Sequence, residues 1–95
     1  MPGFGSSSSN RNNLSADEAL KRAYKLHQQG NIADAEVFYK KSIDAGSKNP
    51  IAFVNLGIIY KISGRLSLAS DCYQSAIRIS PDFQPAYLNL GNLLQ

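Results

Sequence analysis

Apolar and small residues recur every three or four positions from residue 15 onward, which is the spacing of amphipathic helices. The first helix is predicted to begin at Ser15, because Ser15 and Glu18 are spaced as a capping box whose side chains satisfy free backbone amides. Gly30-Asn31 is predicted to end this helix and to cap the next one. The chain therefore starts with a helical hairpin.

The same periodicity predicts four more helices. They cover residues 32–45, 50–62, 66–79 and 84–95. Gly46 is a plausible left-handed C-cap, and Pro50 suits the first turn of a helix. Connections of three to five residues make neighbouring helices antiparallel. The predicted fold is all-α, with five antiparallel helices.

The chain also repeats itself at an offset of 34 residues. The segment PIAFVNLGIIYK, which starts at Pro50, aligns with QPAYLNLGNLLQ, which starts at Gln84. Asn55 thereby aligns with Asn89, and Gly57 aligns with Gly91. A fixed period of this length is typical of stacked helical hairpins, which offer surfaces for binding.

The repeated positions resemble the tetratricopeptide repeat, whose pattern is Trp-x2-Leu-Gly-x2-Tyr, then Ala-x3-Phe, then Pro. In the central repeat these positions are Phe53, Leu56, Gly57, Tyr60, Ala69, Tyr73, Ala76 and Pro81. The first repeat matches more loosely, with Arg22 in place of Leu and Ser47 in place of Pro. The resemblance implies a tetratricopeptide-type solenoid of two repeats and one further helix. Its segments are a flexible tail (1–14), two repeats (15–49 and 50–83) and the first helix of a third repeat (84–95).

Composition narrows the possible functions. The net charge of +3 comes from ten basic and seven acidic residues that are spread along the chain, which argues against nucleic-acid binding. The longest apolar stretch has an interruption at Asn55 and is too short to span a bilayer, so no membrane association is expected. A single cysteine, Cys72, excludes an intrachain disulfide and is compatible with a reducing, cytoplasmic compartment. No pattern indicates a catalytic set, a metal site or a cofactor.

In the family that this chain resembles, the first helix of each hairpin lines a concave groove. The partner-binding residues implied at these positions are Lys21, Tyr24, Gln28, Asn55, Ile58, Ile62, Asn89 and Asn92. Asn55 and Asn89 are similar to the groove asparagines of O-linked N-acetylglucosamine transferase arrays, where paired amides would bind a peptide backbone. The alternative is that they only keep this face hydrated or bond their own neighbours. Ile58 and Ile62, with Ile51, form either an exposed apolar patch or part of the packing between helices.

Other candidate sites are weaker. The family's carboxylate clamp needs Lys and Asn where this chain has Leu20 and Tyr24, which argues against a receptor for chaperone tails. His27 lacks further ligands at metal-binding spacing and is expected in the groove or on the surface. Cys72 is expected to be a buried, unreactive thiol.

Two functions are therefore carried forward. The first is a non-catalytic module that binds a protein or peptide segment in its groove. The alternative is the N-terminal recognition segment of a larger, glycosyltransferase-like enzyme. The last predicted helix ends in Leu93-Leu94, whose outward side lacks a partner helix. Either the chain is part of a longer array, or two chains form a homodimer through this helix.

Overall fold

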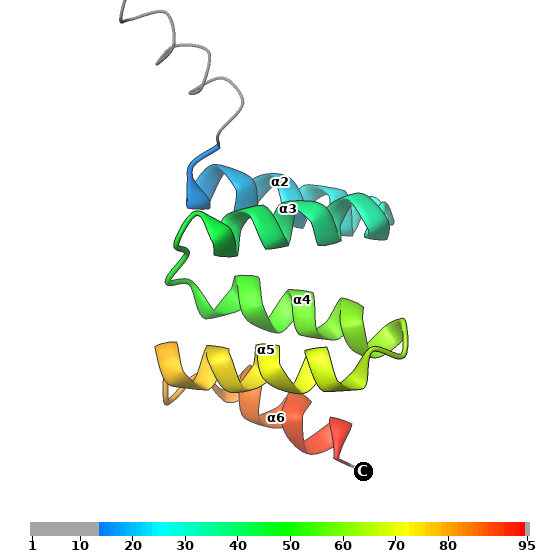
Figure 1. The fold of residues 1–95 in the computed structure, drawn as a ribbon, viewed down its shortest axis with the longest axis vertical. Helices are drawn as coiled ribbons and strands as arrows, with labels where there is room; N and C mark the ends of the chain where they lie inside the picture. The colour runs from blue at the N-terminus through cyan, green and yellow to red at the C-terminus, as the bar shows by residue number, and fades with distance from the viewer. Residues whose placement is uncertain (1–13, 95) are drawn as a thin grey trace, which may run out of the picture.

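A computed structural model describes residues 14–94 as five α-helices, without strands in that range. The helices are α2 (Ala16–Gln28), α3 (Ile32–Asp44), α4 (Pro50–Ile62), α5 (Leu66–Ile79) and α6 (Gln84–Leu93). They stack along the long axis, with the α2–α3 hairpin at one end and α6 at the other (Figure 1). The predicted all-α fold is confirmed. Except for Leu14, the predicted flexible tail (1–14) lies outside the described residues.

The helix ends follow the local sequence. Ser15 accepts a hydrogen bond from the backbone of Glu18, whose carboxylate accepts one from the backbone of Ser15, which completes the predicted capping box. Gly46 has a φ of 92°, the left-handed conformation expected there. The predicted cap at Asn31 is wrong in one respect, because its side chain makes no capping hydrogen bond. The amide of Ile32, the first residue of α3, donates to the backbone carbonyl of Gly30 instead.

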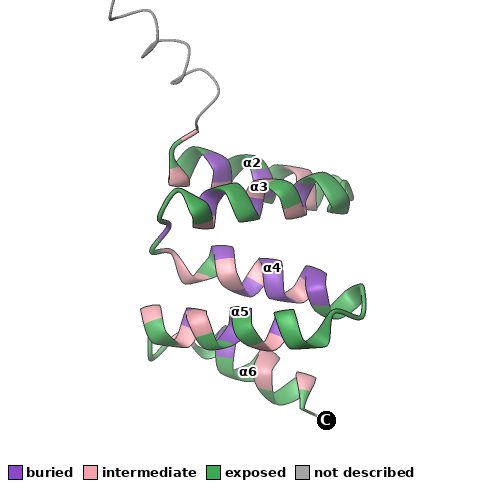
Figure 2. Ribbon diagram, in the orientation of Figure 1, coloured by how far each residue is buried: buried purple, intermediate pink, exposed green. Residues whose placement is uncertain are grey.

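The core lies between the two helices of each hairpin and between the hairpins (Figure 2). Tyr39 on α3 and Tyr73 on α5 are fully buried and lie one 34-residue period apart. Gly57 lies directly beneath the Tyr73 ring, since a Cβ atom added there would be 2.5 Å from Cε1 of that ring. In the second hairpin, side chains therefore fill the space so closely that α4 has no room for a methyl group at Gly57.

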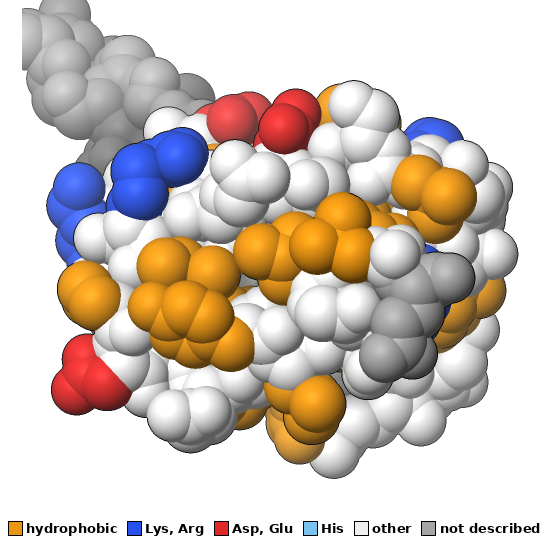
Figure 3. Space-filling view, turned by 90° about the horizontal axis from the view of Figure 1, so that it is seen from below, with side chains coloured by type: hydrophobic (Ala, Val, Ile, Leu, Met, Phe, Trp, Pro, Cys, Tyr) orange, Lys and Arg blue, Asp and Glu red, His pale blue; other side chains and the backbone are white. Residues whose placement is uncertain are grey.

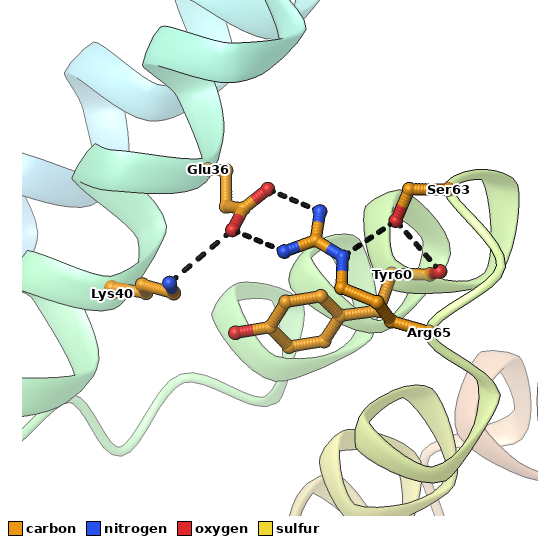
Figure 4. A network of polar contacts seen from close by, with 5 residues as sticks. All are labelled: Glu36, Lys40, Tyr60, Ser63 and Arg65. Atoms are coloured by element: carbon orange, nitrogen blue, oxygen red, sulfur yellow. Dashed lines mark hydrogen bonds and ion pairs between the residues drawn. The ribbon is translucent and has the colours of Figure 1, made fainter.

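An ion-pair network joins the first hairpin to the second (Figure 4). The guanidinium of Arg65 donates two hydrogen bonds to the carboxylate of Glu36 on α3, at 2.8 and 2.6 Å. Lys40 approaches the same carboxylate at 3.2 Å. Arg65 also stacks over the ring of Tyr60, 4.8 Å from its centroid, and donates to the hydroxyl of Ser63. This network fixes the turn before α5 against α3.

The two departures from the repeat pattern in the first hairpin have structural roles. Arg22 is exposed, and its guanidinium lies 5.4 Å from the ring centroid of Phe38 on α3. Ser47 is buried, and its hydroxyl accepts a hydrogen bond from the amide of Asn49 before α4 begins. A polar residue is therefore accommodated at each position.

None of the helices in residues 14–94 has the length and apolar character needed to cross a membrane.

The two aligned glycines should respond to alanine in opposite ways. Gly57→Ala is expected to cost about 1–3 kcal/mol of unfolding free energy, because the new methyl group overlaps the Tyr73 ring. Gly91→Ala is expected to gain up to about 1 kcal/mol, because nothing lies within 4 Å of its added Cβ and alanine favours the helix. Urea unfolding at low protein concentration measures both. Equal effects of the two substitutions would contradict the close contact at Gly57.

The Glu36 network should make stability depend on pH. The hydrogen bonds from Arg65, followed by those from Lys40, hold the pKa of the Glu36 carboxyl below its ordinary value of 4.5. A lowered folded-state pKa gives stability that is present above pH 4.5 and is lost as the pH falls through the folded value. Glu36→Gln should therefore lower stability by up to about 1 kcal/mol at pH 7.

The difference between Glu36→Gln and the unsubstituted chain should shrink steadily below pH 4.5, as measured by thermal unfolding across pH. Asp82→Asn serves as the control because Asp82 is exposed in the turn before α6. A Glu36→Gln difference that persists at pH 2.5 would show that the carboxylate charge is not its origin.

Candidate functional site

An open groove is lined by residues of α2 and α4. Leu20, Lys21 and Tyr24 line it from α2, and Ile51 lines it from α4. Tyr24 is 50% exposed and Ile51 is 40% exposed, so both side chains present apolar surface to solvent. Apolar side chains that remain accessible in a groove are typical of a binding surface. We call these four residues the α2–α4 groove.

Asn55 lies one turn after Ile51 on α4, and its side chain is engaged within the protein. Its amide Nδ2 donates a hydrogen bond to the hydroxyl of Tyr39 at 3.1 Å. Nδ1 of His27 on α2 lies 3.0 Å from the same hydroxyl. Because the hydroxyl oxygen accepts from Asn55, its own proton is free to be donated to His27. Three helices are thus joined at one buried oxygen.

The aromatic rings of His27 and Tyr39 are also in contact. His27 meets the edge of Tyr39 in a T-shaped arrangement, with centroids 5.7 Å apart and planes at 78°. Burial raises the pKa of the Tyr39 hydroxyl, and the hydrogen bond from Asn55 opposes that shift. Tyr39 therefore stays protonated at neutral pH and remains available as a donor. We call Tyr39, His27 and Asn55 the tyrosine junction.

The equivalent junction one period later is not formed. Tyr73 and Asn89 match Tyr39 and Asn55, yet the Tyr73 hydroxyl is buried and has no hydrogen-bond partner. Asn89 instead donates to the carbonyl of Pro85 at 2.7 Å, one turn back on α6. Lys61 occupies the position equivalent to His27 and offers no acceptor. Helix α6 is therefore held without the polar contact that fixes α4.

The remaining predicted partner-binding residues lie apart from the groove. Ile58 is half-buried and packs against the core, whereas Ile62 is 76% exposed near the end of α4. Gln28 at the end of α2 is exposed, as is Asn92 on α6. The structure thus places Lys21 and Tyr24 together with Ile51. It also shows that the amides of Asn55 and Asn89 already donate hydrogen bonds to neighbours.

His27 has a contact that was not predicted from the sequence. Its ring is half-buried, and its Nδ1 lies 3.0 Å from the Tyr39 hydroxyl. The sequence contains one sign of the tyrosine junction. Tyrosine and asparagine recur 16 residues apart, at Tyr39 and Asn55 and again at Tyr73 and Asn89. Within residues 14–94, no group of three histidine, cysteine, aspartate or glutamate side chains is placed to hold a metal ion.

A second depression lies between α3 and α5, with α4 as its floor. Phe53, Leu56 and Tyr60 contribute from α4, and Cys72 contributes from α5. Cys72 is only 9% exposed, and burial raises the pKa of its thiol to about 11. The thiol is therefore protonated and unreactive at neutral pH, as expected from the sequence.

Comparison with known proteins identifies the architecture. A family model described as TPR repeat matches residues 59–95. The first and second TPR domains of Spaghetti (RPAP3), both solved with the HSP90 peptide SRMEEVD, superpose with TM-scores of 0.76 and 0.77. Residues 59–95 match the tetratricopeptide repeat family, and the described helices have its fold. Sequence identity to these structures is 23% and 19%, so their likeness concerns the fold.

The extent of these matches differs. The two alignments cover 83% and 90% of this chain, and 63% and 80% of the respective RPAP3 chains. A probable UDP-N-acetylglucosamine–peptide N-acetylglucosaminyltransferase, SPINDLY from Arabidopsis thaliana, is 31% identical over 77 residues. That alignment covers 81% of this chain but only 8% of SPINDLY. The shared region is thus a small part of the larger protein.

The hydroxyl groups of the two aligned tyrosines should contribute differently to the free energy of unfolding. Tyr39→Phe is expected to cost about 1–2 kcal/mol, because it leaves the Asn55 amide and the His27 ring without their partner. Tyr73→Phe should leave stability unchanged or raise it by up to about 1 kcal/mol, because its hydroxyl has no partner to lose.

Chemical denaturation of the two variants side by side makes this comparison. Each substitution removes one oxygen from a fully buried ring, so the apolar packing is matched. Similar losses in both variants would show that the hydroxyl of Tyr73 also has a partner in solution.

Proposed function

We propose that this chain is a non-catalytic module that binds a peptide or a segment of a partner protein in the α2–α4 groove. The observation that carries the proposal is the exposure of Tyr24 and Ile51 in that groove. Aromatic side chains on a rigid scaffold bury a large area at low entropic cost, which makes Tyr24 the expected anchor. The packed helices of the tetratricopeptide fold hold the groove residues in fixed positions.

The proposed ligand has an apolar side chain next to an acidic or carbonyl group. The apolar group would contact Tyr24 and Ile51, and the ammonium group of Lys21 at the same groove would bind the oxygen. This mode differs from the carboxylate clamp, because Leu20 and Tyr24 occupy the positions where that clamp needs Lys and Asn. The proposal therefore does not extend the ligand of the RPAP3 structures to this chain.

In this proposal, Asn55 and Asn89 are not the main ligand-binding residues that their repeated spacing suggested. Asn55 uses its amide group on Tyr39, so its carbonyl oxygen is the atom left for a ligand. Asn89 would have to release the carbonyl of Pro85 before its amide could bind a peptide backbone. Substituting Asn55 would also disturb the tyrosine junction, which makes groove residues the cleaner test.

A second candidate function rests on the similarity to SPINDLY. Under this alternative, residues 14–94 would be a recognition segment of a larger transferase that presents substrates to a catalytic domain. The 31% identity over 77 residues favours it, although the match covers 8% of that relative. A glycosyltransferase domain encoded downstream of residue 95 would support the alternative. The protein- or peptide-binding role of the groove is common to both candidates, and a cytoplasmic location remains a prediction for either.

Substitutions in the groove should weaken binding without changing the fold. A peptide selected from a displayed library against the full chain provides the ligand. Tyr24→Ala and Ile51→Glu should each raise its dissociation constant at least about tenfold, because each removes apolar contact in the groove. Calorimetric titration measures the constants, and circular dichroism confirms the fold.

Val37→Glu is the matched control for these variants. Val37 is 48% exposed on α3, close to the exposure of Ile51, and does not line the groove. It should bind the peptide as well as the unsubstituted chain does. Full binding by both groove variants, or loss of binding only in the Val37 variant, would place the site elsewhere.

A further inference from the structure

Two adjacent depressions form one continuous groove between the hairpins. The first is the depression between α3 and α5, and its volume is about 350 Å³. The second has a volume of about 520 Å³, and its lining residues are Lys48, Phe53, Ser75, Arg78 and Ile79. Because Phe53 and Ser75 line both depressions, the two spaces are connected. We call the two depressions together the α3–α5 groove.

The repeat units on both sides of this groove are present in the chain. Its walls are α3 of the first hairpin and α5 of the second, and α4 lies between them (Figure 1). The end of the stack differs in this respect. Apolar side chains gather there as well (Figure 3), but Gly91 on α6 is the equivalent of Gly57, which Tyr73 of the following helix covers. The α3–α5 groove is therefore a surface that stays open after neighbouring repeats have packed.

The α3–α5 groove and the α2–α4 groove lie on opposite sides of α4. An α-helix turns about 100° per residue, so Phe53, Leu56 and Tyr60 are about 140–200° around α4 from Ile51. The first three line the α3–α5 groove, whereas Ile51 lines the other. Occupation of one groove therefore leaves the other accessible.

Apolar side chains form the floor and one edge of the α3–α5 groove. Leu68 on α5 is 45% exposed at this edge, and Phe53 on the floor is half-buried. Accessible apolar side chains in a concave surface are typical of a docking site. Burial, followed by the charge of Asp71, raises the pKa of the Cys72 thiol on the same floor. A carboxylate thus lies close to the apolar surface.

Charged side chains have a fixed order along the groove. Asp44 and Asp71 line the first depression, whereas Lys48 and Arg78 line the second. Asp71 and Arg78 are seven residues apart on α5, which is about 10 Å along the helix axis. The ion pairs found within residues 14–94 do not include any of these four side chains. One end of the groove is therefore acidic and the other basic, with both charges available to a ligand.

We propose that the α3–α5 groove is a second docking surface, which binds an extended segment of a partner protein with a large apolar side chain between a basic and an acidic one. The apolar side chain contacts Phe53 and Leu68, the basic one lies beside Asp71, and the acidic one lies beside Arg78. An extended chain advances about 3.3 Å per residue, so the two charges of the segment are about three residues apart. This role does not depend on the function proposed for the α2–α4 groove.

The two kinds of contact have different parts in this recognition. Burial of the apolar side chain supplies most of the affinity, because the floor of the groove is apolar. Charges at the rim of an interface mainly set orientation and partner choice. The order of the charges in the groove therefore determines the direction in which the segment lies.

A random peptide library displayed on phage provides the probe. The full chain with Ile51→Glu is the bait, since this substitution places a charge in the α2–α4 groove and disfavours ligands of that site. Enriched peptides should contain a large apolar residue between a basic and an acidic residue that are about three positions apart. Failure to enrich peptides of this kind overturns the proposal.

Substitution of one of two leucines on α5 locates the bound peptide. Leu68→Glu should raise its dissociation constant at least about tenfold, because the new charge lies at the apolar edge of the groove. Leu66→Glu is the matched control, since Leu66 is 52% exposed on the same helix and does not line the groove. Calorimetric titration measures both constants, and thermal unfolding checks the fold. Any result other than a selective loss in the Leu68 variant overturns the assignment.

Charge reversal tests the orientation of the segment. Arg78→Glu should weaken binding about threefold or more, and a peptide with lysine in place of its acidic residue should restore it. Asp71→Lys should weaken binding similarly, and a peptide with glutamate in place of its basic residue should restore it. Exchanging the two altered peptides should restore neither variant. Restoration in the exchanged pairs overturns the proposed direction.

Discussion

The contact between the Tyr73 ring and the backbone at Gly57 sets how closely the helices of the second hairpin approach. An added Cβ would be 2.5 Å from the ring, so no other residue fits at Gly57 without displacing a fully buried aromatic side chain. Alanines at Ala69 and Ala76 on α5 are likewise fully buried. Small residues thus bring the helices together, and one large ring fills the space that is left.

Tyr39 serves two interfaces. Its ring is buried in the core beside its own hairpin, and its hydroxyl accepts a hydrogen bond from Asn55 on the first helix of the next hairpin. The same hydroxyl joins Asn55 and His27. The bidentate pair between Glu36 and Arg65 reinforces the same boundary. Contacts within a hairpin are therefore mainly apolar, whereas the boundary between the hairpins also depends on polar groups.

Most of the fold could be predicted from the sequence because its determinants are local. Gly46, Pro50 and the capping box at Ser15 mark helix ends by their own backbone preferences, and the structure follows them. The 34-residue period then dictates the stacking. Asn31 misled the prediction because glycine at the preceding position already turns the chain, and backbone groups satisfy the start of α3.

The candidate site was less predictable because it depends on side-chain partners that lie far apart in sequence. A helical period assigns Asn55 to a face, but it cannot show that its amide will reach a hydroxyl on another helix. The same applies to His27, whose ring is used between helices α2 and α3. Ile51, Ile58 and Ile62 share a sequence spacing, yet their exposures diverge because neighbouring helices cover α4 unevenly.

The polar contacts between neighbouring helices differ along the stack, and this difference affects the order of local unfolding. In a stack of repeats, each element is stabilised only by its neighbours, so local unfolding starts at the weakest boundary. The boundary between the first and second hairpins has the tyrosine junction and an ion pair, whereas the Tyr73 hydroxyl lacks a partner and Asn89 on α6 bonds only within its own helix. Helix α6 is therefore the element that detaches first, and its backbone amides exchange with solvent ahead of those in α3 and α4.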